Sequence, residues 1–175
     1  MEKTMVVNQK EYKIVRLLGH GKGGYSYLAC RSEDVGKDKR ENAYVLKQIH
    51  HEPCEYYMFG DKIAAEQNDY RRLRETGIRI PQMIDVDVPN ERIIKEYIEG
   101  PTLSELLEAK RPVQAYVDQI RQMAGQVRVY GLNIDYYPTN FVVRDGLVYY
   151  IDYECNTYSE EWSFENWGIT CYLRE

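Results

Sequence analysis

The sequence lacks long hydrophobic runs and a signal-like N-terminus. No stretch of the 175 residues approaches about 18 consecutive apolar positions, the length of a membrane-spanning helix. The first 13 residues contain neither an apolar core nor a small-residue cleavage site. We therefore expect a cytoplasmic protein with no membrane partner.

The sequence also has few metal-binding and disulfide-forming residues. Its four cysteines show no C-x-x-C spacing, and its three histidines do not complete a ligand set with them. Scattered cysteines in a chain without a signal peptide indicate reduced thiols, and we expect no structural zinc. These residues are Cys30, Cys54, Cys155, Cys171, His20, His50 and His51.

An excess of positive charge is absent as well. Lys and Arg number 23 against 28 Asp and Glu, which gives a net charge of −5 and excludes whole-surface binding of nucleic acid or anionic membranes. Hydrophobic residues make up 43%, typical of a globular protein, and Tyr, with 17 copies against 3 Phe, is the dominant aromatic residue.

The first half of the chain is predicted to form a sheet with one helix. Val-, Ile-, Leu- and Tyr-rich runs predict strands, and apolar positions at helical spacing over 61–75, followed by Gly77, predict a helix. Together they predict a five-stranded antiparallel sheet plus one helix. The expected strands are 12–18, 25–30, 43–49, 80–86 and 92–98.

After Pro101 the pattern becomes helical. Thr102 and Glu105 match a capping box, and the apolar spacing over 113–130 predicts a long helix that Gly131 ends. Two β-prone runs, 141–143 and 147–151, flank Asp145-Gly146, a strong hairpin signal.

Two charged residues interrupt apolar stripes. Lys47 lies on the strand face of Ala43, Val45 and Ile49, and Glu66 interrupts the helical stripe over 61–75. A charge on an apolar face is costly unless paired, so these two can satisfy one another. Either they form a structural ion pair or snorkel on partly exposed elements, or Glu66 holds the lysine ammonium toward phosphates.

Two further motifs could bind a phosphate or a cation. Gly19-x-Gly21-x-x-Gly24 lies between strands rather than before a helix, which favours a hairpin that covers phosphates. The alternative is a flexible hairpin tip that binds nothing, which would contain the same glycines. Asp135, Asn140 and Asp152 offer oxygen ligands suited to Mg²⁺, whereas each aspartate alone could be a turn-former or a cap.

In order, these motifs resemble the eukaryotic-like protein kinase superfamily from about Tyr12 to Glu154. The resemblance implies an α+β, two-lobed protein-kinase-like fold. It further implies an N-terminal lobe over 1–95 with the five-stranded sheet and helix, a hinge over 96–101, and a truncated helical C-terminal lobe over 102–175.

The resemblance also implies roles for single residues, with ATP and Mg²⁺ as cofactors. Asp135 matches the catalytic aspartate, and Asn140 and Asp152 match the metal ligands. Lys47 matches the phosphate-binding lysine, with Glu66 as its helix partner. The other implied nucleotide-binding residues are Gly19, Gly21 and Gly24 of the loop, Ala29 and Val45 as adenine-pocket walls, and Glu96, Tyr97 and Ile98 of the hinge.

Departures from the family pattern narrow the subfamily. Asn133-Ile134 replaces the usual His-Arg before the catalytic aspartate, and Tyr137 replaces the loop lysine. Asp152-Tyr153-Glu154 is similar to the corresponding motif of aminoglycoside- and choline-type phosphotransferases. Residues 77–81 resemble a segment of the RIO kinases, which also have a short C-terminal lobe. A helix is expected to begin within 162–168, beneath the catalytic loop.

From these observations we predict an ATP- and magnesium-dependent phosphotransferase. It would move the γ-phosphate to a hydroxyl group, in the manner of a bacterial or atypical Ser/Thr protein kinase. The alternatives are a small-molecule kinase for aminoglycosides, choline or sugars, and a nucleotide-binding pseudokinase that acts as an interaction module. The acceptor is then a protein or a small molecule.

Overall fold

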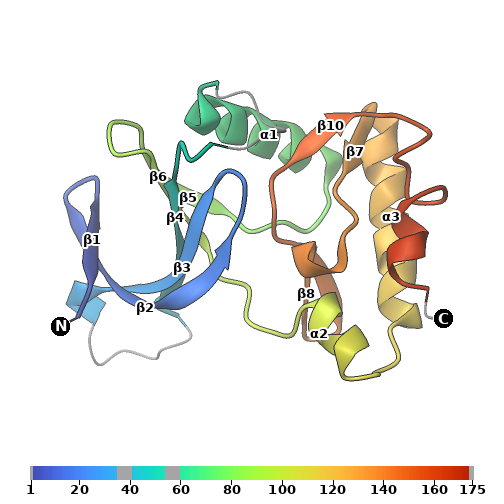
Figure 1. The fold of residues 1–175 in the computed structure, drawn as a ribbon, viewed down its shortest axis with the longest axis horizontal. Coiled ribbons are helices and arrows are strands. Elements are labelled where there is room, and N and C mark those ends of the chain that lie inside the picture. Colours follow the sequence, from blue (N-terminus) through green and yellow to red (C-terminus); the bar gives the residue numbers. More distant parts are fainter. Residues whose placement is uncertain (1, 35–40, 54–59, 174–175) are drawn as a thin grey trace. The chain divides into compact units, whose positions relative to one another are not determined.

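The computed structural model describes residues 2–34, 41–53 and 60–173, which form two compact units. The first unit comprises residues 1–65 and 82–97, and the second comprises 66–81 and 98–175. Each combines helix with antiparallel sheet, as the elements labelled in Figure 1 show, so the α+β prediction is confirmed. The expected division into lobes and hinge stays a prediction.

The first unit contains one antiparallel sheet of six strands, in the order β1-β2-β3-β4-β6-β5. The expectation of five strands was wrong because it missed β1, which has only four residues. A turn through Asn8 and Gln9, both at positive φ, joins it to β2, and this turn lacks the glycine that usually marks a hairpin. The strands are β1 (Thr4–Val7), β2 (Lys10–His20), β3 (Gly24–Arg31), β4 (Ala43–Ile49), β5 (Met83–Asp87) and β6 (Arg92–Glu96).

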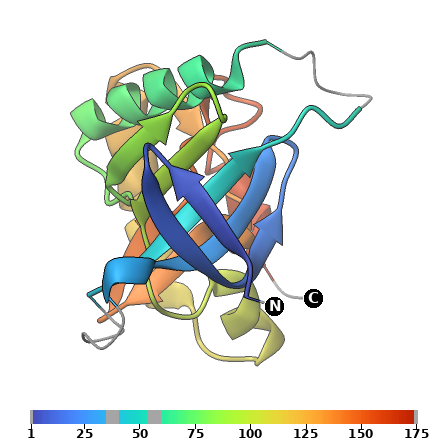
Figure 2. The ribbon, with the colours of Figure 1, turned by 90° about the vertical axis from the view of Figure 1, so that its left-hand side faces the viewer.

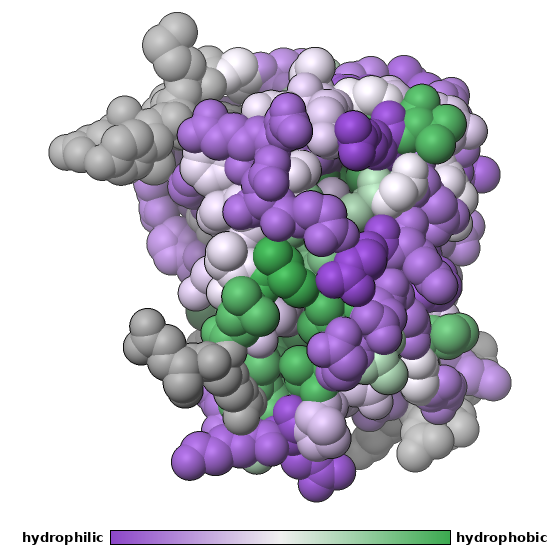
Figure 3. Space-filling model, turned by 90° about the vertical axis from the view of Figure 1, so that its right-hand side faces the viewer, coloured by the Kyte–Doolittle hydropathy of each residue, from purple (hydrophilic) through white to green (hydrophobic). Residues whose placement is uncertain are grey.

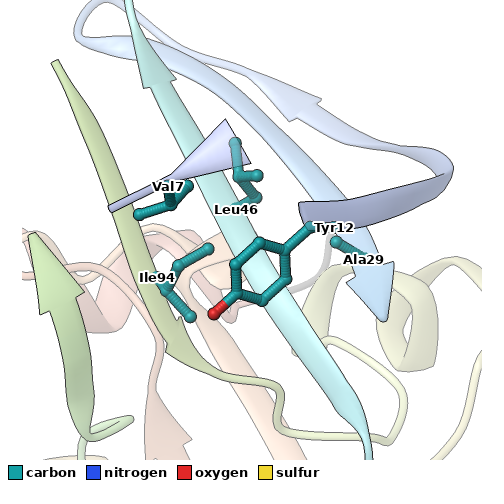
Figure 4. Close-up of a cluster of buried hydrophobic side chains, with 5 residues drawn as sticks. All are labelled: Val7, Tyr12, Ala29, Leu46 and Ile94. Atoms are coloured by element: carbon teal, nitrogen blue, oxygen red, sulfur yellow. The ribbon is translucent and has the colours of Figure 1, made fainter. Parts of the chain in front are cut away.

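This sheet curls, so its first and last strands approach each other (Figure 2). Asn8 links them: its backbone N–H donates to Asp87 Oδ2 at 3.1 Å, and its side-chain amide donates to Asp85 Oδ1 at 2.7 Å. The curl encloses one sheet face, on which Tyr12 packs against Val7, Leu46 and other apolar side chains (Figure 4).

The opposite sheet face packs against the start of helix α1 (Lys62–Thr76). Ile63 of α1 forms a buried cluster there with Ile49 of β4 and Ile93 of β6. The alternation predicted for β4 is confirmed, because Leu46 lies in the Tyr12 cluster whereas Ile49 lies in this one. Lys47 therefore lies on the sheet face against which Ile63 packs.

The second unit is built around helix α3 (Gln114–Val129), whose apolar stripe is buried as predicted. Thr102 caps α2 (Leu103–Glu108) through the expected capping box, and Asp145-Gly146 forms the expected hairpin turn. The hairpin is β8 (Phe141–Arg144) with β9 (Leu147–Tyr150), and a second pair is β7 (Leu132–Ile134) with β10 (Cys155–Thr157). The buried stripe of α3 is Val117, Ile120, Met123 and Val127.

Residues 77–81, which follow α1, are anchored to the hairpin of the second unit. Arg79 donates through Nε to the Val148 carbonyl at 2.7 Å, and the Arg79 carbonyl accepts from the Tyr150 N–H at 2.9 Å. The Pro81 carbonyl accepts from the Tyr153 hydroxyl at 2.8 Å. This segment therefore fixes the strand and the loop that carry Asp152.

The C-terminal residues of the second unit differ from the expectation. Residues 162–167 form turns, and only a short 3₁₀ helix (Gly168–Cys171) follows, so no α-helix begins there.

Seen from the side of α3 and the C-terminus, hydrophobic residues gather among hydrophilic ones (Figure 3). The second unit exposes the large apolar side chains of Val129, Tyr130, Tyr137, Leu147, Trp162 and Leu173.

None of the helices in the described ranges has the length and apolar character needed to cross a membrane. Among the cysteines in these ranges, Cys30, Cys155 and Cys171 are free thiols, and Cys54 lies outside them.

Candidate active site

The glycine loop connects β2 to β3 within the first unit. Its turn is closed by a hydrogen bond from the Gly21 N–H to the Gly24 carbonyl at 3.0 Å. The ammonium of buried Lys62, at the start of α1, donates to the carbonyls of Lys22 and His50 at 3.2 and 2.5 Å. Lys62 thus anchors the loop through two hydrogen bonds. No local pattern in the sequence indicated this role.

The glycines of the loop differ in whether neighbouring atoms exclude a side chain. A Cβ at Gly24 would lie 2.5 Å from the Gln48 carbonyl oxygen of β4, so close strand packing excludes a side chain there. A Cβ at Gly19 or Gly21 would meet open space. A Cβ at Gly23 would lie 3.5 Å from Lys47 Nζ, so the lysine ammonium lies directly beside the loop backbone.

Strand register determines which residues share a sheet face with Lys47. Leu28 is paired with Val45, and residues directly opposite each other point to the same side of the sheet. Ala29, expected as a wall of the adenine pocket, is instead paired with Tyr44 and is buried in the Tyr12 cluster on the other face. Leu28 and Ser26, the partners of Val45 and Lys47, therefore lie on the face of these two residues, whereas Ala29 does not.

The expected pairing of Lys47 with Glu66 stays a prediction. Ile63 of α1 packs on the sheet face that carries Lys47, and Glu66 follows Ile63 by three residues. Positions three apart lie on the same side of a helix. Glu66 therefore lies on the same side of α1 as Ile63.

The segment expected as a hinge begins at the end of β6. The Glu96 N–H donates to the carbonyl of Gln82, the residue before β5, at 2.9 Å, so this donor is already used. The boundary between the two units falls between Tyr97 and Ile98, inside the segment 96–101.

The second unit brings Asp135, Asn140 and Asp152 together. Asn140 donates through Nδ2 to the Asp135 carbonyl at 3.3 Å, and its own carbonyl accepts from the Ile151 N–H at 2.9 Å. β10 pairs with β7, which lies directly before Asp135, so the loop of Asp152 returns beside the loop of Asp135. All three side chains are half-buried.

Backbone N–H groups orient both carboxylates. Asp135 Oδ1 accepts from the Tyr137 N–H at 3.1 Å. Asp152 Oδ1 accepts from the N–H groups of Tyr153 and Glu154, at 2.7 and 3.3 Å. Each carboxylate is thus held through one oxygen atom, which points the other oxygen away from the backbone.

Helix α1 also supports the segment of Asp152. The ring of buried Tyr153 packs against Tyr70 of α1 with 4.9 Å between ring centroids. The Cys155 thiol donates to the Asp69 carbonyl at 3.9 Å, and burial raises the pKa of this thiol to about 12. A neutral Cys155 is therefore a packing residue rather than a nucleophile.

Tyr150 is a central residue that the sequence analysis missed. It is fully buried, its hydroxyl donates to the Glu154 carbonyl at 2.7 Å, and the same oxygen accepts from the Asp135 N–H at 3.3 Å. Burial, followed by the negative charges of Asp152 and Asp135, raises its pKa well above 10, so the hydroxyl stays protonated. Tyr150 thus links the two aspartate loops, and its position two residues before Asp152 was the available signal.

The donor set of these loops fits Mg²⁺. Two carboxylates and an amide oxygen are the hard oxygen ligands that Mg²⁺ prefers, and bound water molecules would complete its octahedral shell. Because Asn140 donates through Nδ2, its Oδ1 atom is the one that can ligate a cation.

Comparison with known proteins agrees with the motifs. No family model matches the chain. The chain is 31% identical over 171 residues to the KEOPS complex subunit Bud32 of Pyrococcus abyssi, an alignment that covers 91% of this chain and 74% of that protein. The chain therefore belongs to the Bud32 family of atypical, RIO-like members of the protein-kinase-like superfamily.

Proposed function

We propose that this protein is an ATP- and magnesium-dependent phosphotransferase that moves the γ-phosphate to a hydroxyl group, that of a protein serine or threonine. The observation that carries the proposal is the grouping of Asp135, Asn140 and Asp152 in two hydrogen-bonded loops. Family membership supports it, because kinase-like activity is expected of a Bud32 relative.

Each proposed role follows from the chemistry of the side chain. Lys47 and the glycine loop bind the nucleotide phosphates, because an ammonium group beside backbone N–H groups attracts phosphate oxygens. Bound Mg²⁺ supplies charge neutralisation at the phosphates, and Asn140 and Asp152 are the residues that would hold it. Asp135 accepts a hydrogen bond from the acceptor hydroxyl and orients it for transfer.

The remaining site residues contribute to nucleotide binding. Glu66 orients Lys47, and Gly19 and Gly21 leave the loop backbone uncovered so that phosphates can approach it. Val45 and Leu28 contact one side of the adenine ring. The hinge residues, Glu96, Tyr97 and Ile98, supply the backbone groups that recognise its edge. Phosphoryl transfer relies on positioning and electrostatics, which these groups provide.

The decisive experiment compares Asp152→Asn with wild type. Labelled ATP is incubated with the protein and with a panel of peptides, aminoglycosides, choline and sugars, with and without Mg²⁺. Asp152→Asn should abolish magnesium-dependent transfer, because an amide is a weaker ligand for Mg²⁺ than a carboxylate. Undiminished transfer by this variant would contradict the metal role of Asp152.

Asp145→Asn is the matched control. Asp145 is exposed in the hairpin turn of the same unit and has φ of +51°, a conformation that asparagine also tolerates. This variant should keep full transfer. Asp135→Ala should lose turnover but keep nucleotide affinity, because orientation of the acceptor is separate from ATP binding.

Tyr137 favours a second candidate function, that of an interaction module. It occupies the position of the usual loop lysine, its side chain is 54% exposed, and the Bud32 relative is a subunit of the KEOPS complex. A pseudokinase of this kind would bind nucleotide and a protein partner without transfer. Nucleotide binding with no labelling of any acceptor would favour it, and recovery of transfer in Tyr137→Lys would show that the missing lysine limits catalysis.

A further inference from the structure

Three side chains converge at the base of the glycine loop, outside the aspartate loops. His20 ends β2, while His50 and Glu52 follow β4. His20 Nε2 lies 3.1 Å from Glu52 Oε2, and His50 Nε2 lies 3.6 Å from the same oxygen. The ligand atoms of the three groups all lie within 4.8 Å of one another.

These spacings match the coordination shell of a small cation. Ligands about 2.0–2.1 Å from a tetrahedral Zn²⁺ are about 3.4 Å apart. The two nitrogen–oxygen distances lie on either side of that value. Two imidazoles and one carboxylate also form a common zinc ligand set, in which water completes the tetrahedron. His20 and Glu52 are about half exposed, so water has access to the fourth position.

Tyr25 orients two of the ligands, Glu52 and His20, before a metal ion binds. The Tyr25 hydroxyl donates to Glu52 Oε1 at 2.5 Å, which leaves Oε2 directed toward both histidines. The imidazole of His20 stacks on the Tyr25 ring with 4.2 Å between centroids. Such outer partners fix the orientation of metal ligands and are part of most metal sites.

His50 must exchange hydrogen bonds to bind a metal. Its Nδ1 accepts from the Glu52 N–H at 3.2 Å, so its Nε2 carries the proton that is shared with the Gly21 carbonyl at 2.8 Å. Coordination through Nε2 moves this proton to Nδ1 and releases both hydrogen bonds. Metal binding and the hydrogen bond to Gly21 are therefore mutually exclusive.

We propose that His20, His50 and Glu52 form a binding site for a late first-row divalent cation such as Zn²⁺. Imidazole ligands favour such cations over Mg²⁺, so the site is chemically distinct from the one proposed at Asp152. A cation here links the glycine loop to the segment after β4 and replaces the hydrogen bond between His50 and Gly21. No cysteine is one of the three ligands of this site, because Glu52 supplies the third ligand.

Metal titration of the untagged protein without nucleotide tests the site. Calorimetry with Zn²⁺ should show one ion bound per chain, and Co²⁺ should give the visible absorption of a tetrahedral site without the near-ultraviolet band of thiolate ligation. His20→Asn and Glu52→Gln should each weaken Zn²⁺ binding by more than the roughly 10- to 100-fold typical of a lost outer partner. Tyr25→Phe should weaken it by about 10-fold.

Two controls separate this site from others. His51→Asn should leave Zn²⁺ affinity unchanged, because His51 contacts Glu91 at 2.7 Å and is not one of the three ligands. Asp152→Asn should also leave it unchanged, so failure of the phosphotransferase proposal would not affect this result. Equal affinity in wild type, His20→Asn and Glu52→Gln, absence of Zn²⁺ binding, or a thiolate band with Co²⁺ would each overturn the proposal.

Discussion

Individual buried polar groups in the first unit differ in how fully they are hydrogen-bonded. The Tyr12 hydroxyl has no hydrogen-bond partner among the described residues, although the Tyr12 side chain is fully buried. The Asp87 carboxylate, also buried, accepts from the Asn8 N–H and from both the N–H and the side-chain amide of Asn90. An unsatisfied buried group costs free energy, whereas a satisfied one stabilises the fold.

Removal of the Tyr12 hydroxyl should therefore not lower the free energy of unfolding. We expect Tyr12→Phe to leave the free energy of unfolding unchanged or raise it, because only an unpaired polar atom is lost. Tyr12→Ala should lower it by about 3–5 kcal/mol, because it leaves a cavity among Val7, Leu46 and Ile94. Urea unfolding of the three proteins measures both effects. A loss of more than about 1 kcal/mol in Tyr12→Phe would indicate that a water molecule satisfies the hydroxyl.

Asp87 should make stability depend on pH. Hydrogen bonds from Asn90 and Asn8 lower the pKa of Asp87 below its ordinary value, so the carboxylate stabilises the fold above the unfolded pKa of about 3.9. This contribution is lost as the pH falls through the folded pKa. We expect Asp87→Asn to be less stable than wild type at pH 7 by about 1–3 kcal/mol, with the difference shrinking below about pH 4.

Unfolding midpoints of wild type and Asp87→Asn between pH 2 and pH 7 measure this dependence. Glu99→Gln is a control for general charge effects, because Glu99 is exposed to solvent. A difference between wild type and Asp87→Asn that stays constant with pH would contradict the role given to the ionised carboxylate.

At the scale of elements, close backbone contacts decide where strands and loops meet. Gly100 has φ of +152°, and a Cβ there would lie 1.9 Å from the Val143 carbonyl oxygen of β8. The Val143 N–H donates to the Pro101 carbonyl at 2.9 Å, and Thr102 forms an isolated bridge with Val142. The segment after Gly100 therefore adds to the edge of the β8–β9 hairpin, before α2 begins.

Gly100→Ala should lower stability by more than 2 kcal/mol, because it combines backbone strain with a steric clash. Gly146→Ala is the matched control. Gly146 also has a positive φ, +77°, but its Cβ would meet open space, so only the strain of roughly 1–2 kcal/mol applies. Thermal unfolding of both variants measures the difference. Equal losses would show that the backbone near Val143 moves to accommodate a methyl group.

Tyr150 connects two elements through its hydroxyl. Tyr150→Phe leaves the Asp135 N–H and the Glu154 carbonyl without this partner, and we expect a loss of about 1–3 kcal/mol in stability together with reduced phosphoryl transfer. Tyr149→Phe is the control, because the Tyr149 hydroxyl accepts a hydrogen bond from Arg144 of the same hairpin rather than from an aspartate loop. Full transfer by Tyr150→Phe would show that the aspartate loops keep their positions without the hydroxyl.

For the whole molecule, nucleotide binding should appear as added stability. Mg·ATP at 100 times its dissociation constant should raise the free energy of unfolding by roughly 2.7 kcal/mol, because it binds only the folded state. The rise should shrink in Lys47→Ala and without Mg²⁺. Calorimetric melting measures it. If neither ATP nor GTP at millimolar concentration shifts the melting temperature, the proposed nucleotide site does not exist.

Much of the fold followed from local sequence patterns. The bounds of β4 agree with the predicted strand 43–49, and α1 and α3 agree within one or two residues with their predicted ranges. Period-2 and period-3.6 patterns arise from backbone geometry, so they can be read without tertiary information. The capping box at Thr102 and the turn at Asp145-Gly146 were predicted for the same reason.

Three of the short strands could not be found in this way, because no Asp-Gly turn marks them as it marks β8 and β9. β1, β7 and β10 have only three or four residues each, too few for a periodic pattern. They form because a neighbouring strand supplies hydrogen-bond partners, as β7 does for β10. The family resemblance implied the start of a helix within 162–168, whereas residues 162–167 form turns in which Phe164 packs against Tyr136.

The sequence by itself determined which residue types and motifs this protein has: the glycine loop, a lysine and a glutamate on apolar stripes, and an Asp–Asn–Asp set around a hairpin. Tertiary structure decided which of them meet. Strand register placed Ala29 on the face opposite Lys47, and folding brought His20 beside Glu52 and Tyr150 between two aspartate loops. Contacts between residues distant in the chain depend on register and packing, which no local pattern encodes.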